Sequence, residues 1–138
     1  MSKNILTLSD ATFDETIGGA DTPVLVDIWA SWCAPCKAAF PAYEELFQSY
    51  KSRGFDVLAV NVDEKRSAAE QFLSGRDIQM RVLFDPRGAT PAAFRLEGMP
   101  TSYLIDKRGA IRFVHEGFTD KSIAQYKHEI EQLIAETP

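Results

Sequence analysis

The sequence has few cysteines, no excess of positive charge and no long apolar run, and each of these features excludes a class of protein. Its 138 residues carry 15 Lys and Arg against 20 Asp and Glu, a net charge of -5 at pH 7. A nucleic acid or an anionic membrane surface would require a basic face, so neither is expected as a partner. No apolar run is long enough to span a bilayer. Two cysteines are too few for a disulfide framework.

The start of the chain also lacks the pattern of an export signal. Residues 1–4, MSKN, are not followed by the basic and then apolar segments of a secretory signal. No internal repeat, linker or low-complexity run is visible, and the length suits one domain over residues 1–138. We therefore expect a single domain located in the cytoplasm. A periplasmic or other extracytoplasmic location is the alternative if an export signal was removed.

One stretch, residues 24–40, combines a strand, a turn and the start of a helix. The run VLVDIW, residues 24–29, is rich in β-branched residues and is interrupted only by Asp27, which suits a strand buried on both faces. The turn then places Cys33 and Cys36 where an alanine-rich, helix-favouring segment begins. The other elements are expected to be arranged around this stretch.

Periodicity and turn residues predict the remaining elements. Ser9 or Asp10 is expected to cap a first helix, and Thr119 or Asp120 to cap the last one. A strand, helix and strand of the observed lengths imply a parallel pair with a right-handed crossover. The expected strands are 5–8, 24–29, 55–62, 81–84, 102–105 and 110–115, and the later helices are about 33–53, 64–74, 90–96 and the C-terminal segment.

The two cysteines have the CxxC spacing of a redox pair. A thiol at a helix N-terminus feels the partial positive charge of unpaired amides, which favours its thiolate. Lowering its pKa from about 8.5 to about 7 corresponds to roughly 2 kcal/mol and makes about half of it thiolate at neutral pH. Cys33 is the residue so placed and is the expected nucleophile. Cys36, one turn further into the helix, should be more buried and should resolve the mixed disulfide.

Asp27 is the candidate proton acceptor for this chemistry. A carboxyl group in an apolar strand has its pKa raised by desolvation, towards the range useful for a base near neutral pH. The alternative is a strand-end aspartate that only accepts a hydrogen bond from a backbone amide.

Two other interpretations of the cysteines are a zinc half-site and an inert structural disulfide. Zinc normally needs four ligands, and only His115 and His128 could join the cysteines. His115 lies in an expected strand and His128 in the middle of an expected helix. We favour redox chemistry, because the CxxC lies within a βαβ pattern, and we expect neither a metal nor a bound cofactor.

The motif WCAPC (32–36), preceded by VDIWAS and followed much later by GMPT (98–101), resembles the thioredoxin superfamily over nearly the whole chain. This resemblance implies an α/β thioredoxin fold with a central mixed five-stranded sheet flanked by helices. It also implies that Cys33 is the nucleophile, Cys36 the resolving cysteine and Asp27 the buried acid. Pro100 would follow a cis peptide bond, and the backbone of Met99 would pair with an extended substrate segment.

The resemblance further implies a substrate-docking surface around the cysteines, for which the alternative is ordinary packing and turn chemistry. The expected substrate-binding residues are Trp32, Ala34, Pro35, Met99, Pro100 and Gly117.

Two features distinguish the chain from plain thioredoxin. An insertion at about residues 65–97 adds about twenty residues, enough for one strand and one helix. With FDVLAVNVDE and TSYLIDKRG, it looks like the TlpA/ResA type of thiol-disulfide oxidoreductase. Members of that branch often carry a glutamate where Ala39 stands, and some thioredoxins carry a lysine where Ala59 stands. Peroxiredoxins place a threonine at the position of Ala30, so peroxidase activity is not expected.

The expected function is a thiol-disulfide oxidoreductase that reduces protein disulfides by dithiol-disulfide exchange. Its partners would be protein disulfide substrates and a reducing partner protein, and the chain is expected to be a monomer. Two alternatives remain open. One is a reductase dedicated to a single partner, such as an apocytochrome c, with the insertion as its recognition surface. The other is a non-catalytic binding module of thioredoxin fold. The direction of electron flow also stays open.

Overall fold

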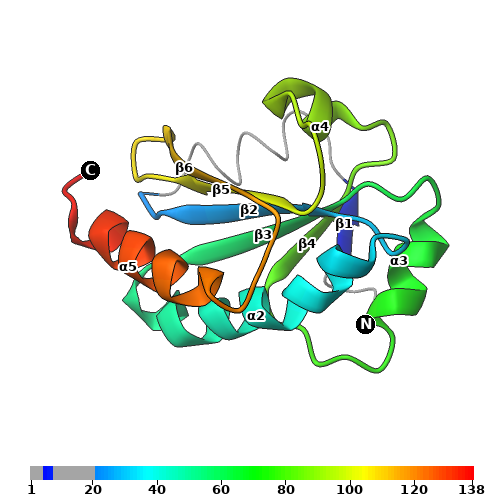
Figure 1. Ribbon diagram of the computed structural model, residues 1–138, viewed down its shortest axis with the longest axis horizontal. Coiled ribbons are helices and arrows are strands. Elements are labelled where there is room, and N and C mark those ends of the chain that lie inside the picture. The colour runs from blue at the N-terminus through cyan, green and yellow to red at the C-terminus, as the bar shows by residue number, and fades with distance from the viewer. Residues whose placement is uncertain (1–4, 8–20) are drawn as a thin grey trace.

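The computed structural model of the chain describes residues 5–7 and 21–138. The helix expected to begin at Ser9 or Asp10 lies outside these residues. The described elements follow the expected order (Figure 1). They are β1 (Ile5–Thr7), β2 (Val24–Trp29), α2 (Ala34–Tyr50), the 3-10 turn η2 (Lys51–Arg53), β3 (Asp56–Asn61), α3 (Arg66–Leu73), β4 (Arg81–Phe84), α4 (Ala89–Phe94), β5 (Thr101–Ile105), β6 (Ile111–Glu116) and α5 (Ser122–Ala135).

The six strands of the described residues form one mixed sheet in the order β1-β4-β3-β2-β5-β6. β2 runs parallel to β3, as the sequence predicts for a strand-helix-strand unit. β5 is antiparallel to β2, and β6 is antiparallel to β5. The five expected core strands are therefore present in a thioredoxin fold. The sixth strand, β4, lies between β1 and β3 and pairs in parallel with both.

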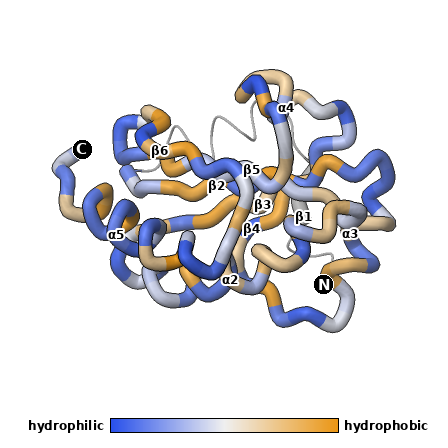
Figure 2. Tube along the Cα trace, in the orientation of Figure 1, coloured by the Kyte–Doolittle hydropathy of each residue, from blue (hydrophilic) through white to orange (hydrophobic). Residues whose placement is uncertain are grey.

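The central strand β2 is buried on both faces, which explains its continuous apolar run. All six of its residues are buried, and their side chains alternate between two cores. Leu25 and Trp29 lie in the core that is covered by α2, α3 and α5, whereas Val26 and Ile28 lie in the core on the side of α4 (Figure 1). Hydrophobic segments concentrate on the central strands and the outer loops are mostly hydrophilic (Figure 2).

The end of α2 lies where the sequence predicts it, but the start of α5 does not have the predicted cap. Gly54 ends the turn after α2 with a φ of 83°, a conformation that glycine adopts without steric cost. The prediction that Thr119 or Asp120 caps the last helix is wrong. Lys121 occupies the N-cap position of α5 without a capping side-chain bond. Ser122 N donates to the oxygen of Thr119, so a tight turn precedes the helix and keeps Thr119 outside it.

Within the described part of the chain, no helix combines the length and the apolar character that crossing a bilayer requires.

Candidate active site

Cys33 and Cys36 form a disulfide at the N-terminus of α2, with their Cα atoms 5.2 Å apart. Cys33 is the N-cap residue, and its Sγ accepts a hydrogen bond from the backbone nitrogen of Cys36 at 3.3 Å. Cys33 retains 7% of its surface and Cys36 none, as the sequence predicts. Pro35 fits the first turn because its missing N–H would be unpaired there in any case.

The position of Cys33 favours a negative charge on its sulfur once the disulfide is opened. The oxygen of Cys33 accepts the first helical hydrogen bond, from Lys37 N at 3.1 Å, so the free amides of α2 point towards this end. The helix dipole and an amide donor next to the Sγ atom both stabilise a thiolate. The arrangement therefore suits a nucleophilic sulfur at Cys33 and a protected one at Cys36.

Asp63, which the sequence analysis did not single out, holds the turn that leads to the cysteines. Its carboxylate accepts hydrogen bonds from the backbone nitrogen and the hydroxyl of Ser31. It also accepts one from Asn61 Nδ2, and the Asp63 side chain is almost fully buried. An aspartate directly after a buried strand, at the same sheet edge as the CxxC turn, is the signal that could have identified it.

The loop before β5 reaches the same end of the sheet as the cysteines. The bond between Met99 and Pro100 is cis, as predicted. β5 begins with Thr101 opposite Ile28, so the two residues before it lie beside the end of β2. Gly117, with a φ of 77°, donates its N–H to the oxygen of Pro100 at 2.7 Å. The structure thus brings the predicted residues of this loop to the start of the CxxC turn.

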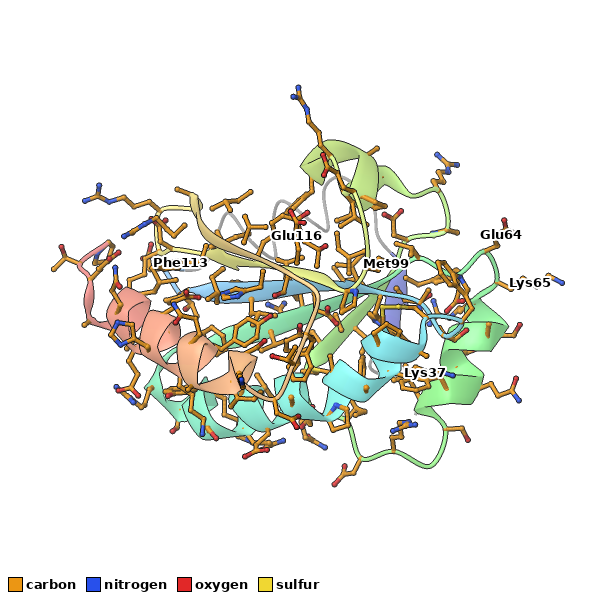
Figure 3. The ribbon with its side chains drawn as sticks, in the orientation of Figure 1. Lys37, Glu64, Lys65, Met99, Phe113 and Glu116 are labelled. Carbon is orange, nitrogen blue, oxygen red and sulfur yellow. A yellow bond between two sulfur atoms is a disulfide. The ribbon has the colours of Figure 1, made fainter. Side chains whose placement is uncertain are left out.

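Exposed side chains surround the disulfide. Trp32 is 69% exposed, Ala34 and Pro35 are also exposed, and Met99 is half-buried. A hollow of about 500 Å³ lies between Trp32 and the start of α3, where Asp63, Glu64, Lys65 and Ala68 complete its lining. Lys37, Glu64 and Lys65 lie where α2 and α3 begin (Figure 3). This surface combines one large apolar side chain with charges of both signs.

Asp27 lies in the middle of β2 with no exposed surface. Its side chain is on the same face as Leu25 and Trp29, because side chains alternate along a strand. Neither of its carboxylate oxygens has a hydrogen-bond partner in the described residues. The alternative in which Asp27 only bonds a backbone amide is therefore wrong. Burial raises the pKa of Asp27 well above its usual value.

Three buried hydroxyls lie on the same side of the sheet, and the sequence analysis did not predict that they form a cluster. The hydroxyls of Tyr43 and Tyr126 are 3.1 Å apart, and those of Ser102 and Tyr126 are 2.5 Å apart. Both tyrosines lie in the apolar core, Tyr43 on α2 and Tyr126 on α5. The signal that could have revealed the cluster is Ser102, a polar residue that precedes the run YLI in the same strand.

The two histidines do not join the cysteines. His115 Nε2 lies 2.5 Å from Glu129 Oε1, and its ring packs against Tyr126 at 4.3 Å between centroids. His128 is exposed on α5. Among the described residues, no three His, Cys, Asp or Glu side chains are placed to hold a metal ion. The geometry therefore gives no support to a zinc half-site.

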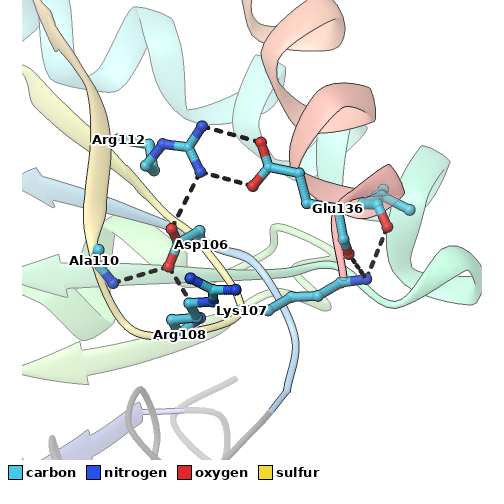
Figure 4. A network of polar contacts seen from close by, with 7 residues as sticks. Asp106, Lys107, Arg108, Ala110, Arg112 and Glu136 are labelled. Carbon is cyan, nitrogen blue, oxygen red and sulfur yellow. Dashed lines mark hydrogen bonds and ion pairs between the residues drawn. The ribbon is translucent and has the colours of Figure 1, made fainter. Parts of the chain in front are cut away.

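A separate polar cluster lies at the opposite end of the sheet, where β5 ends beside the start of β2 (Figure 4). Arg112 donates hydrogen bonds to both oxygens of Glu136 and to Asp106. Lys107 Nζ donates to the backbone oxygens of Ile134 and Glu136. These contacts attach the end of α5 to the turn between β5 and β6. They are remote from the cysteines and explain the position of α5.

Comparison with known proteins agrees with this fold and site. The Redoxin family model matches residues 8–133. ResA, a thiol-disulfide oxidoreductase of Oceanobacillus iheyensis, is 33% identical over 94 residues, 68% of this chain and 49% of ResA. The chain spans about half the length of the curated relatives it matches.

Two solved structures illustrate the structural similarity. A thiol:disulfide interchange protein DsbE from Chlorobium tepidum is 36% identical with a TM-score of 0.82, covering 89% of this chain and 85% of that one. The exposed lipoprotein thioredoxin Etrx1 of Streptococcus pneumoniae is 26% identical with a TM-score of 0.71, covering 86% and 89%. The chain belongs to the Redoxin family and is a ResA-like member of the thioredoxin superfamily.

Proposed function

We propose that this chain is a thiol-disulfide oxidoreductase that reduces protein disulfides by dithiol-disulfide exchange. The observation that carries the proposal is the Cys33–Cys36 disulfide at the N-terminus of α2, with the more accessible sulfur on Cys33. The names of ResA and the Chlorobium protein support the same chemistry. The disulfide is the product state of such a reaction, and its reduced form would be the reactant.

The reaction proceeds in two exchanges that balance electrons and protons. The Cys33 thiolate attacks one sulfur of the substrate disulfide. A Cys33–substrate bond forms, the substrate disulfide breaks, and its second sulfur leaves as a thiolate that takes a proton. Cys36 then loses its proton and attacks the sulfur of Cys33. The mixed disulfide breaks, the substrate leaves with two electrons, and Cys33 and Cys36 are joined.

Asp27 is the proposed acceptor of the Cys36 proton. It is buried on the face of β2 that is packed against α2, and Cys36 belongs to the core on that face. The raised pKa of Asp27, caused by burial, makes the carboxylate a stronger base than an exposed aspartate would be. A base of this kind would accelerate the second exchange and leave the first one largely unaffected.

The substrate is proposed to bind around the exposed edge of the disulfide. Trp32, Ala34 and Pro35 are exposed on the turn, and Met99 lies half-buried in the loop beside it. The backbone of Met99 would pair with an extended substrate segment, while Pro100 and Gly117 hold the loop through their hydrogen bond. Main-chain pairing of this kind accepts many sequences, as a general reductase requires.

The proposal is tested with single serine variants of the two cysteines. Cys33→Ser should lose turnover with a protein disulfide substrate, and it should form no mixed disulfide. Cys36→Ser should also lose turnover but should accumulate a mixed disulfide on Cys33, detectable by mass spectrometry. Persistent turnover in Cys33→Ser would contradict the proposed function. The potential of the cysteine pair gives the direction: a reductant should lie near or below about -250 mV, whereas a value above about -180 mV would indicate an oxidant.

A second candidate is a reductase dedicated to one partner, which the hollow between Trp32 and α3 favours. Its lining comes from the CxxC turn and from the start of the insertion, so it could recognise one protein surface. Weak activity on a generic protein disulfide, with a normal potential, would support this candidate. The name of the exposed lipoprotein from Streptococcus pneumoniae supports an extracytoplasmic location for either candidate.

A further inference from the structure

A second hollow, of about 260 Å³, adjoins the one beside Trp32. Ala68 of α3 borders both hollows, and the neighbouring residues Ser31 and Trp32 of the CxxC turn line one each. The second hollow therefore lies between α3 and the start of α2, where Lys37 is found (Figure 3). Its full lining is Ser31, Lys37, Ala68, Gln71 and Phe72.

Lys37 is the only charged side chain in this lining. It is exposed, and it takes part in none of the ion pairs in the part of the chain that the structure describes. Two acids of the adjoining segment have other partners. Glu70 of α3 pairs with Arg66, and the Asp63 carboxylate accepts two hydrogen bonds from Ser31. The ammonium group of Lys37 is therefore free to pair with a carboxylate of another molecule.

The rest of the lining fits the stem and the oxygens of an acidic side chain. Phe72 supplies a fixed apolar wall, because its ring packs against Trp29 at 5.1 Å between centroids. The guanidinium carbon of Arg76 lies 4.0 Å from the centroid of the same ring, which adds positive charge near the hollow. Gln71 is exposed on α3, and its amide can donate a hydrogen bond to a carboxylate.

The hollow is close enough to the disulfide to contact a bound substrate. Lys37 directly follows Cys36 and lies about one helical turn beyond Cys33, which is about 5–6 Å along the axis. An extended segment advances about 3.3–3.6 Å per residue. When a substrate cysteine is bonded to Cys33, side chains about two or three positions away along the substrate can therefore reach Lys37.

We propose that this hollow binds an acidic side chain of the substrate protein, close to its reacting cysteine, and that Lys37 selects for that side chain. The inference rests on the proposed function, because it requires a protein substrate that bonds to Cys33. The substrate carboxylate pairs with the Lys37 ammonium group and accepts a hydrogen bond from Gln71. Its methylene groups pack against Phe72. Protein disulfides with an acidic residue at this distance are then the preferred substrates.

The hollow beside Trp32 is a poorer place for a carboxylate. Asp63 and Glu64 line it together with a single cation, Lys65, so a further anion there would meet like charges. The two hollows thus differ in what they select, with an acidic side chain at Lys37 and apolar contact at Trp32. Lys65 is therefore the residue that separates a specific site at Lys37 from a general attraction by surface cations.

The experiment measures kcat/KM of the reduced full chain with synthetic disulfide peptides at low salt. Each peptide carries one glutamate at a chosen position on either side of the cysteine, and a matched peptide carries glutamine there. At the best position, the native chain should prefer the glutamate peptide about fivefold, the upper end for an exposed ion pair. Lys37→Gln should reduce this ratio to about one, and Lys37→Glu should reverse the preference. Both peptides react with the same Cys33, so the ratio cancels any effect of a variant on the cysteines.

Lys51→Gln is the matched control, since Lys51 is an exposed lysine at the opposite end of α2. It should leave the ratio and both rates unchanged. A preference that survives in Lys37→Gln, or that falls as far in Lys65→Gln as in Lys37→Gln, overturns the proposal. Equal rates for the two peptides at every position in the native chain overturn this inference alone. Failure of the native chain to reduce any peptide would contradict the proposed function and this inference with it.

Discussion

Ser31 donates two hydrogen bonds to the carboxylate of Asp63, one from its backbone nitrogen at 3.0 Å and one from its hydroxyl at 2.8 Å. Asn61 Nδ2 donates a third at 2.7 Å. Just before these residues, Val62 N donates to the oxygen of Trp29 at 2.9 Å. The turn that carries the cysteines is therefore attached to the end of the neighbouring strand and not only to the helix it begins.

Replacing Asp63 with alanine should destabilise the protein and disturb this turn. The substitution leaves the amide of Ser31 and the side chain of Asn61 without their charged acceptor, which should lower the free energy of unfolding by about 2–3 kcal/mol. Urea denaturation measures the loss. Glu64→Ala removes the next, exposed carboxylate and should change stability by less than about 0.5 kcal/mol. Equal losses in the two variants would show that Asp63 does not hold the turn.

The raised pKa of Asp27 predicts an unusual dependence of stability on pH. The native state binds the Asp27 proton more tightly than the unfolded chain does, because burial penalises the carboxylate. Asp27 therefore costs no stability below the unfolded pKa of about 3.9, and costs progressively more as the pH rises towards its native pKa.

The matching variant is Asp27→Asn, which cannot ionise. It should be more stable than the native protein at neutral pH, and this advantage should vanish as the pH falls below about 4. Urea denaturation at several pH values measures the difference. A difference that stays constant between pH 4 and 8 would mean that Asp27 has the same pKa in the native and the unfolded chain, and that burial does not raise it.

The sequence predicts the helices and strands themselves better than it predicts which strands pair in the sheet. Residues 81–84 were expected to form a strand and do so, because a short apolar run bounded by turn residues is a local signal. The position of β4 between β1 and β3 has no such local signal, because the periodicity of a strand does not determine which strands it pairs with. The start of α5 was missed for a related reason: the turn at Thr119 satisfies the backbone before a side-chain cap is needed.

The same division applies to the candidate site. Cys33, Cys36 and the cis bond at Pro100 follow from motifs that are short in sequence or typical of the superfamily. The contact between Tyr43 and Tyr126 joins residues 83 positions apart. The hydrophobic periodicity of the two helices predicts that both tyrosines are buried, but it does not predict what their hydroxyls bond to. Polar networks between buried aromatic residues therefore had to come from the structure.

The ion pairs at the far end of the sheet predict the opposite pH dependence from Asp27. The backbone N–H of Ala110, together with Arg112, holds the pKa of Asp106 below its usual value, and Arg112 lowers the pKa of Glu136. Groups with lowered pKa values contribute stability above their unfolded values of about 4 and lose it as the pH falls through the native values.

Arg112→Met should therefore be less stable than the native protein at pH 7, and the difference should shrink as the pH falls below about 4. Arg108→Met is the control, because Arg108 lies in the same turn and is exposed. Thermal unfolding across pH 2–8 measures both. A loss in Arg112→Met that does not vary with pH would assign it to packing of the side chain instead of to its charge.

Trp32 offers the sharpest test of how substrates dock. It is 69% exposed, next to Cys33, and it forms one wall of the hollow that α3 completes. Large aromatic side chains at the centre of an interface commonly contribute more than 1 kcal/mol to binding. Trp32→Ala should therefore raise the KM for a protein disulfide about tenfold, which corresponds to about 1.4 kcal/mol.

The same variant should leave the rate with a small aliphatic disulfide unchanged, because such a substrate reaches Cys33 without covering the hollow. Val114→Ala is the matched control, since Val114 is 51% exposed on β6, a different element from those that line the hollow. Equal losses on both substrates would mean that Trp32 acts on the cysteines themselves. No loss on either would mean that substrates dock elsewhere, and the loop at Met99 would then be the surface to vary next.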